Sequence, residues 1–202
     1  LLEFNGTNGS EPWGSLISDG TFLYGMTGEG GVNNNGVIFK ILPNGSGYVK
    51  LFDFEAATSG NFTPGSLIYD GTFLYGMAND GGANDAGTIF KIRPDGTGFV
   101  KLFDFNATAT GSRPYGSLFS DGTFLYGMTA SGGTNNLGTL FKILPVGTGF
   151  VKLLDFNGSV NGASPYGSLI SDGTFLYGMT SNGGSSNNGT IFKILKDGTG
   201  YV

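Results

Sequence analysis

The side chains that could carry chemistry in this sequence belong to few types. The chain has 15 acidic and 10 basic residues, and it contains neither cysteine nor histidine. Thiol nucleophiles, imidazole bases and the usual zinc and copper ligands are therefore missing, so we expect no metal site and no cofactor. Carboxylates remain, and two of them about 5 to 10 Å apart in a cleft can hydrolyse a glycoside. Any catalysis would accordingly depend on a pair of acidic residues.

The acidic residues follow a repeat more than they form pairs. One group precedes a glycine in recurring turns: Asp19, Asp70, Asp121 and Asp172. A second group shares one strand-end position: Glu3, Asp53, Asp104 and Asp155. Others are scattered over different loops: Glu11, Glu29, Glu55, Asp80 and Asp85. Because Asp-Gly is turn chemistry, we predict a protein that is not an enzyme, and a glycoside hydrolase is the weaker alternative.

The elements that carry these residues come from one unit written four times. The segment "SDGTFLYGMT" begins at Ser18 and returns, almost unchanged, at Tyr69, Ser120 and Ser171. The glycine that opens each unit recurs in steps of 51 residues, at Gly14, Gly65, Gly116 and Gly167. A period of about 50 residues is typical of kelch-like propellers.

Each unit predicts four short antiparallel strands and no helix. Asp172-Gly173 between two apolar runs indicates a hairpin, "SNGGSSNNG" a longer loop, and "KDGTG" a second turn. Both faces of the strands are apolar, so neighbouring sheets are expected to cover them. We predict an all-β fold, a β-propeller of four four-stranded antiparallel blades of about 51 residues each. It forms a single repeat domain, 1–202, with units of approximately 1–50, 51–101, 102–152 and 153–202.

The two ends of the chain share one strand between them. Residues 201–202 begin the fourth strand of the last unit, and residues 1–4 align with the second half of that strand at 153–156. The last blade is therefore predicted to be completed by the N-terminal strand. Completion within one chain closes the ring and is favoured, because it leaves no unpaired edge. Completion between chains would give a larger ring or a fibre, and the ends could also be the cut edges of a longer array.

The charge and hydropathy patterns exclude two classes of partner. A net charge of −5 leaves no basic stripe for phosphates, so we expect no nucleic-acid partner. No apolar run approaches the roughly 20 residues that span a bilayer, so we expect no membrane insertion.

The repeat resembles that of a bacterial family. The segment "GSLISDGTFLYGMTSNGGSSNNGTIFKILKDG" is similar to the repeat of GloVer-type, or choice-of-anchor, tandem-repeat surface proteins, with their "GSLI", "LYGMT", "GTIFKI" and "DG" elements. The resemblance covers all four units. It implies secretion, a separate C-terminal anchor and a propeller-like array, and it brings no catalytic residues with it.

The variable part of the repeat is the loop that leads from the fourth strand of one sheet to the first strand of the next. We call these segments the entry loops; they span 5–14, 55–65, 106–116 and 157–167. Loops on a rigid scaffold are where function concentrates. The candidate ligand-binding residues are Trp13, Tyr115, Tyr166, Glu11, Phe62 and Arg113. The competing interpretation is that the Pro-aromatic-Gly segment packs the junction between two blades.

These loops predict a binding function at the cell exterior. Aromatic rings beside polar side chains suit sugar stacking or a protein hot spot, so the expected partner is a glycan or a surface protein. The expected location is extracellular or the cell surface, with Asn5, Asn106 and Asn157 as candidate glycosylation acceptors in N-x-[ST] sequons. The alternative is a structural repeat of a surface layer or filament, self-associating through the split strand.

Overall fold

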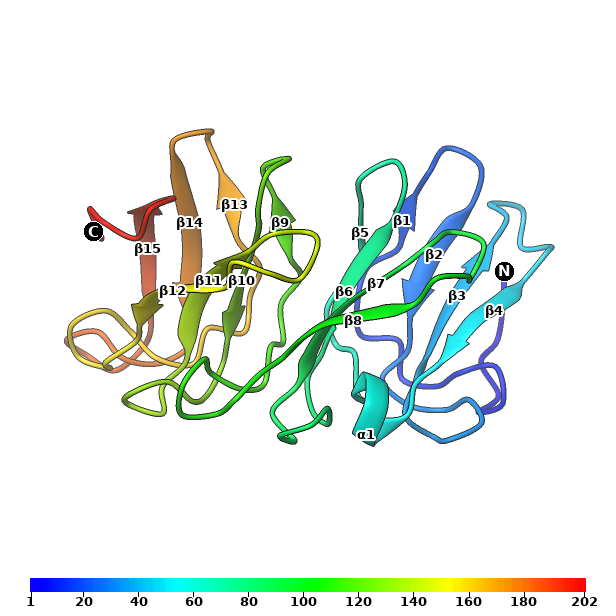
Figure 1. Ribbon diagram of the computed structural model, residues 1–202, viewed down its shortest axis with the longest axis horizontal. Helices are drawn as coiled ribbons and strands as arrows, with labels where there is room; N and C mark the ends of the chain where they lie inside the picture. Colours follow the sequence, from blue (N-terminus) through cyan, green and yellow to red (C-terminus); the bar gives the residue numbers. More distant parts are fainter. The chain divides into compact units, whose positions relative to one another are not determined.

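The computed structural model describes residues 1–202, which divide into two compact units, Leu1–Asp104 and Phe105–Val202. Each unit contains two antiparallel sheets (Figure 1) and is described by itself. The first unit holds β1 Ile17–Ser18, β2 Leu23–Met26, β3 Val37–Ile41 and β4 Val49–Asp53 in one sheet, and β5 Ile68–Tyr69, β6 Leu74–Ala78, β7 Thr88–Ile92 and β8 Val100–Asp104 in the other. The strands pair in chain order, which confirms the predicted meander.

The second unit repeats this arrangement with one strand fewer. Its sheets contain β9 Phe119–Ser120, β10 Leu125–Thr129, β11 Thr139–Ile143 and β12 Val151–Asp155, followed by β13 Ile170–Ser171, β14 Phe175–Thr180 and β15 Thr190–Leu195. Val202 exchanges two backbone hydrogen bonds of 2.9 Å with Lys193, so it begins a fourth strand beside β15. Completion of this sheet by the N-terminal strand stays a prediction.

Within each unit the two sheets pack face to face on an apolar core. In the first unit, Met26 and Ile38 of the first sheet meet Leu67 and Phe90 of the second. In the second unit, the third sheet meets the fourth through the same repeat positions. The faces that meet are apolar because they form this inter-sheet contact, as the sequence predicts.

In each sheet, a glycine in the second strand makes room for the phenylalanine ring of the third strand. A Cβ on Gly76 of β6 would lie only 2.6 Å from Cζ of Phe90. Phe90 also packs edge-to-face on Phe54, with 5.2 Å between the ring centroids. The "LYGM" pattern is thus a packing requirement, and Phe90 is fully buried.

One helix departs from the prediction of an all-strand chain. Ala56–Ser59 forms the single-turn helix α1 in the second entry loop, where the expectation of no helix is wrong. Hydrogen bonds between Ser59 and Glu55 close this turn locally, so no helical periodicity was needed to form it. None of the helices is long and apolar enough to span a bilayer.

Candidate functional site

The candidate site is built from two loops that run side by side at one end of each sheet. Each entry loop forms a β-bridge with the loop between the second and third strands of its own sheet. The bridged pairs are Ser10–Glu29, Asn61–Asp80, Ser112–Ser131 and Ala163–Asn182. In Figure 1 these loops lie at the end of each sheet opposite the tight hairpins, such as β13–β14.

Each entry loop contains a residue in the left-handed region at the same position. These residues are Glu11, Phe62, Arg113 and Ser164, with φ of 55°, 53°, 58° and 53°. A non-glycine residue in this region costs roughly 1 kcal/mol or more and persists only where its surroundings hold it. Here the carbonyl of Glu11 accepts a hydrogen bond of 2.8 Å from the Gly28 N–H. The backbone of the four entry loops is therefore uniform, while the side chain at this position differs from repeat to repeat.

The two residues that follow the left-handed one differ in burial. Thr63 is buried and donates to the Thr27 carbonyl of the preceding sheet at 3.0 Å. Pro165 takes the same position in the second unit, where it is buried and lies against Gly138. The residue that follows is aromatic in every entry loop except the second, which has Pro64 there; Trp13 is 64% exposed and Tyr166 50% exposed. Thr63, Pro114 and Pro165 are thus buried, whereas Pro12 is exposed, and the aromatic residues Trp13 and Tyr166 reach the surface.

Trp13, Glu11 and Phe62 come together in the first unit. The indole N–H of Trp13 donates to the Glu11 carboxylate at 3.4 Å. Its ring lies edge-to-face on Phe62, with centroids 6.2 Å apart. Gly28 lies beneath both rings, because a Cβ there would approach Phe62 to 3.0 Å and Trp13 to 3.2 Å. Gly28 contributes to this aromatic cluster although sequence reasoning did not select it. Its only signal is that the other three repeats carry Asn79, Ala130 and Ser181 at that position.

A second aromatic pair forms in the second unit. Tyr115 and Tyr166 meet edge-to-face with centroids 4.9 Å apart. Arg113 is exposed two residues before Tyr115 in the same loop. The six predicted ligand-binding residues therefore form two groups, one in each unit.

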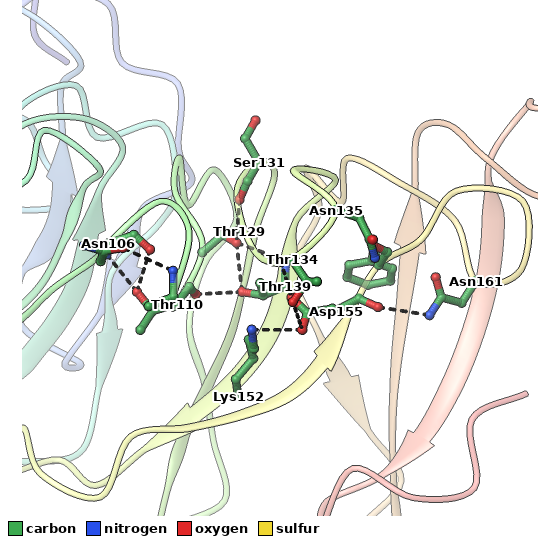
Figure 2. A network of polar contacts seen from close by, with 12 residues as sticks. Asn106, Thr110, Thr129, Ser131, Thr134, Asn135, Thr139, Lys152, Asp155 and Asn161 are labelled. Atoms are coloured by element: carbon green, nitrogen blue, oxygen red, sulfur yellow. Dashed lines mark hydrogen bonds and ion pairs between the residues drawn. The ribbon is translucent and has the colours of Figure 1, made fainter.

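A network of polar side chains holds the loops of the third sheet in place (Figure 2). Thr139 Oγ1 donates to the Thr110 carbonyl at 2.9 Å and lies 2.9 Å from Thr129 Oγ1. Asp155 accepts the Thr134 N–H at 2.9 Å and forms an ion pair with Lys152 at 2.9 Å. Together these bonds tie the entry loop and the β10–β11 loop to β11 and β12, so the candidate site sits on a fixed support.

The candidate glycosylation acceptors occupy exposed positions. Asn5, Asn106 and Asn157 are all exposed in their entry loops. The side-chain oxygen of Asn5 accepts the Asn8 N–H at 3.1 Å, and that of Asn106 accepts the Ala109 N–H at 3.1 Å. Both amide oxygens thus support turns, and the assignment as acceptors stays a prediction.

The turn aspartates are structural, as predicted. Asp172 accepts the N–H groups of Thr174 and Phe175 at 2.9 and 2.8 Å and the Tyr177 hydroxyl at 2.7 Å. The Phe175 N–H, followed by the Tyr177 hydroxyl, lowers the pKa of this carboxyl to about 2. The same bonds recur at Asp19, Asp70 and Asp121.

Because of these turns, we expect the stability of the fold to fall at acidic pH. A carboxyl with a depressed folded-state pKa stabilises the fold above its unfolded value near 4, and this stabilisation is lost as the pH falls toward 2. Asp172→Ala should lower the melting temperature by a few degrees at pH 7, and the difference from wild type should narrow between pH 4 and pH 2. Thermal melts across this range, with exposed Glu29→Ala as the control, test this. A difference that stays constant with pH would contradict it.

The repeated lysines have two different partners. Lys50, Lys101 and Lys152 form ion pairs of 2.8 to 2.9 Å with the strand-end aspartates, as predicted. The lysines of the third strands instead lie over phenylalanine rings; the Lys40 ammonium is 4.7 Å from the Phe22 centroid. Sequence reasoning missed this cation–π partner, because Phe22 lies 18 residues before Lys40, directly before the neighbouring strand β2.

Solved structures identify the class of the fold. The chain resembles the nidogen/laminin complex at 17% identity and a TM-score of 0.58, with 87% of this chain and 56% of that chain covered. It resembles the extracellular domain of the putative one-component system BT4673 from B. thetaiotaomicron at 14% identity and a TM-score of 0.60, covering 95% and 22%. It also resembles the GH74 enzyme of Niastella koreensis at 18% identity and a TM-score of 0.59, covering 90% and 28%. The chain therefore spans between about a fifth and just over half of these structures.

These likenesses and the four antiparallel sheets define a repeat protein with a β-propeller fold, in which each sheet is a blade. The chain belongs to the Gloeobacter/Verrucomicrobia repeat family, which matches residues 65–202. This confirms the resemblance on which secretion and anchoring were predicted. A comparison with curated proteins found no match. The similar structures include an enzyme and an extracellular domain, and at these identities they establish the fold alone.

Proposed function

We propose that the protein is a non-catalytic binding module that acts outside the cell or on its surface and takes carbohydrate or protein on its entry loops. The observation that carries this proposal is the aromatic cluster of Trp13, Phe62 and Glu11. Trp13 is 64% exposed and packs on Phe62, so the cluster presents an exposed aromatic patch of the kind that marks interaction sites. The tyrosine pair Tyr115 and Tyr166 offers a second surface of the same kind.

Carbohydrate is the ligand class that the cluster fits best. The apolar face of a sugar ring stacks on an exposed aromatic ring, and its hydroxyls need polar acceptors nearby. Trp13 supplies the ring, and the Glu11 carboxylate supplies acceptor oxygens beside it. The Glu11 bond also fixes the indole orientation, which lowers the entropy lost on binding. Protein is the second candidate, because the similar nidogen/laminin structure is a complex of proteins.

Two kinds of contact made by the carboxylates support the proposal that the protein is not a catalyst. The turn aspartates bind N–H groups and tyrosine hydroxyls within their own hairpins, and Asp53, Asp104 and Asp155 are paired with lysines. These carboxylates are therefore used by the fold. A glycoside hydrolase would need a pair drawn from the scattered loop acids. The location outside the cell is supported by the family and by the similar extracellular domain.

Trp13→Ala is expected to weaken glycan binding roughly thirtyfold, the loss of about 2 kcal/mol that marks a hot-spot aromatic residue. The wild type is first applied to an array of glycans, and the best ligand is then titrated into each variant by calorimetry. Tyr69→Ala, an exposed aromatic residue at the hairpin end of β5, is the matched control and should bind as the wild type does.

A parallel array of surface glycoproteins, with and without enzymatic removal of their glycans, separates the two ligand classes. Binding that disappears with the glycans indicates carbohydrate, whereas binding that survives indicates protein. If Trp13→Ala binds its ligand as tightly as the wild type, the entry-loop site is refuted.

A further inference from the structure

Asparagine followed by glycine is a chemically labile pair, and it recurs in the loops of this chain. Asparagine is a thermolabile residue, because the backbone nitrogen of the next residue can attack its side-chain amide. Glycine in that next position leaves out the Cβ that would hinder the attack. The pair occurs at eight asparagines: Asn5, Asn8, Asn35, Asn44, Asn157, Asn161, Asn182 and Asn188. Each of these is a position at which the chain could modify itself.

The reaction forms a succinimide and releases ammonia. The backbone nitrogen gives its proton to hydroxide and bonds to the side-chain carbonyl carbon; the bond from that carbon to the amide nitrogen breaks, and ammonia leaves. Water then adds to one of the two ring carbonyls and opens the ring to aspartate or isoaspartate. The backbone nitrogen must be free to lose its proton and to turn toward the side chain. An N–H held in a hydrogen bond is therefore protected.

Backbone carbonyls hold this N–H in seven of the eight pairs, at N–O distances of 2.9 to 3.2 Å. The Gly45 N–H, for example, donates to the Leu42 carbonyl at 2.9 Å, and the Gly189 N–H donates to the Gly183 carbonyl at 3.0 Å. Exchange of a single side chain does not remove such an acceptor. The course of the backbone itself thus protects these seven pairs.

The pair Asn182–Gly183, in the loop between β14 and β15 (Figure 1), is held differently. The Gly183 N–H donates to the side-chain oxygen of Asn187 at 3.0 Å, and no backbone carbonyl accepts it. Protection of this pair therefore depends on one side chain.

The same side-chain bond closes the corresponding loop in the other three repeats. The acceptors are Asn34 for the Gly30 N–H at 3.1 Å, Asp85 for Gly81 at 3.1 Å and Asn136 for Gly132 at 3.0 Å. The residues before these glycines are Glu29, Asp80 and Ser131, none of which carries a side-chain amide. Only in the fourth repeat, therefore, does this structural bond also occupy the nitrogen of an Asn-Gly pair.

A hydroxyl group lies beside the carbonyl that would be attacked. The Ser181 hydroxyl is 2.8 Å from Asn182 Oδ1 and 2.9 Å from the Ser164 carbonyl oxygen, and it can donate to either. When it donates to Oδ1, it stabilises the negative charge that develops on this oxygen during the attack. The carbonyl of Asn182 is thus prepared for the reaction, and Asn187 withholds the nitrogen.

We propose that Asn182 is a site of spontaneous deamidation that the Asn187 side chain holds in check. While Asn187 accepts the Gly183 N–H, this nitrogen neither gives up its proton readily nor turns toward the Asn182 amide. Loss of the acceptor opens the reaction. The inference goes beyond the proposed binding function and does not depend on it.

The product would alter the fourth entry loop. Asn182 exchanges two backbone hydrogen bonds with Ala163 of that loop, 3.1 and 2.8 Å long. Isoaspartate places an additional methylene in the main chain at this residue, so its N–H and carbonyl can no longer face Ala163 together. Deamidation at Asn182 would therefore loosen the entry loop that carries Tyr166.

Deamidation rates at individual asparagines test the proposal. The 202-residue chain is incubated at mildly alkaline pH, either folded or unfolded in guanidinium chloride, and its peptides are followed by mass spectrometry. Asn182 of the folded wild type should react more slowly than Asn182 of the unfolded chain. Asn187→Gly removes the acceptor and suits the left-handed backbone at this residue, where φ is 57°. It should raise the rate at Asn182 in the folded protein roughly five- to tenfold, the factor that corresponds to one lost hydrogen bond.

Asn187→Asp is the matched control, because it keeps an acceptor oxygen as Asp85 does in the second repeat. It should react at Asn182 as slowly as the wild type. Asn188 is the internal control, since a backbone carbonyl holds the Gly189 N–H, and its rate should be equal in all three folded proteins.

Four outcomes would overturn the proposal. The first is an unchanged rate at Asn182 in Asn187→Gly, and the second is an Asn187→Asp protein that reacts as fast as Asn187→Gly. The third is a folded wild type whose Asn182 reacts as fast as in the unfolded chain. The fourth is an equal rise at Asn182 and Asn188, which would show that Asn187→Gly unfolds the loop instead of freeing one nitrogen.

Discussion

Ile38→Ala is expected to lower the free energy of unfolding by about 2 to 5 kcal/mol, and Ile191→Ala by less than about 0.5 kcal/mol. Both residues occupy the same position of the repeat, and both changes remove the same atoms. Ile38 is fully buried between the first and second sheets, so its removal loses apolar burial and leaves a cavity. Ile191 is 81% exposed, so alanine at that position leaves neither.

Urea denaturation of the two variants and the wild type measures this difference. The protein concentration is kept low enough that self-association does not contribute to the stability of Ile191→Ala. Equal losses of stability in the two variants would show that the fourth sheet is covered in the isolated chain, and the burial on which the comparison depends would be wrong.

Much of this fold could be predicted because the sequence repeats its own local signals. Asp-Gly before "TFLYGM" marks a hairpin, and the structure uses Asp172 to bind two turn N–H groups and a tyrosine hydroxyl. The alternation of large apolar residues on both faces predicted stacked sheets, and the cores of the two units confirm it. These features are local in the chain, so the sequence of a single repeat contains the information that specifies them.

Burial could not be predicted from the repeat, because identical residues occupy different surroundings. Met26 and Met179 stand in nearly identical segments, yet one is buried and the other is 59% exposed. Their difference lies in whether a following sheet covers them, which no local pattern records. The helix α1 escaped prediction for a related reason, since Ser59 and Glu55 form it through contacts of one loop and no repeat supports it.

The sequence named candidate site residues, which stay a prediction, but it could not give their arrangement. The entry-loop sequences identified Trp13 and Tyr166 as the aromatic position, and the structure exposes both. The competing interpretation, that the Pro-aromatic-Gly segment packs the blade junction, has support as well: Pro165 is buried, and the Trp13–Phe62 and Tyr115–Tyr166 contacts join the entry loops of neighbouring sheets. The left-handed conformation of Glu11 could not be foreseen, because glutamate rarely adopts it; in the structure the loop is held by hydrogen bonds that include the one from the Gly28 N–H to the Glu11 carbonyl.

Gly116→Ala is expected to destabilise the protein by about 1 to 3 kcal/mol or more, the range for groups forced into a packed contact. A Cβ at this position would collide with the Gly167 carbonyl, which belongs to the backbone of the next sheet and cannot rotate away as a side chain could. The hydrogen bond from the Ser117 N–H to Ser168 Oγ, 2.8 Å long, holds the two segments together beside this contact. Relief would require the two sheets to separate, at the cost of core packing in the second unit.

Gly167→Ala is the matched control for this collision. It makes the same change at the same position of the repeat, but no atom lies within 4 Å of the added Cβ, so its effect on unfolding should stay within about 0.5 kcal/mol. Neither glycine has a positive φ that would penalise alanine, so the pair isolates the steric contact from backbone strain. Urea denaturation of both variants measures the two free energies of unfolding. A Gly116→Ala protein as stable as Gly167→Ala would mean that the ends of the third and fourth entry loops do not approach each other at this point.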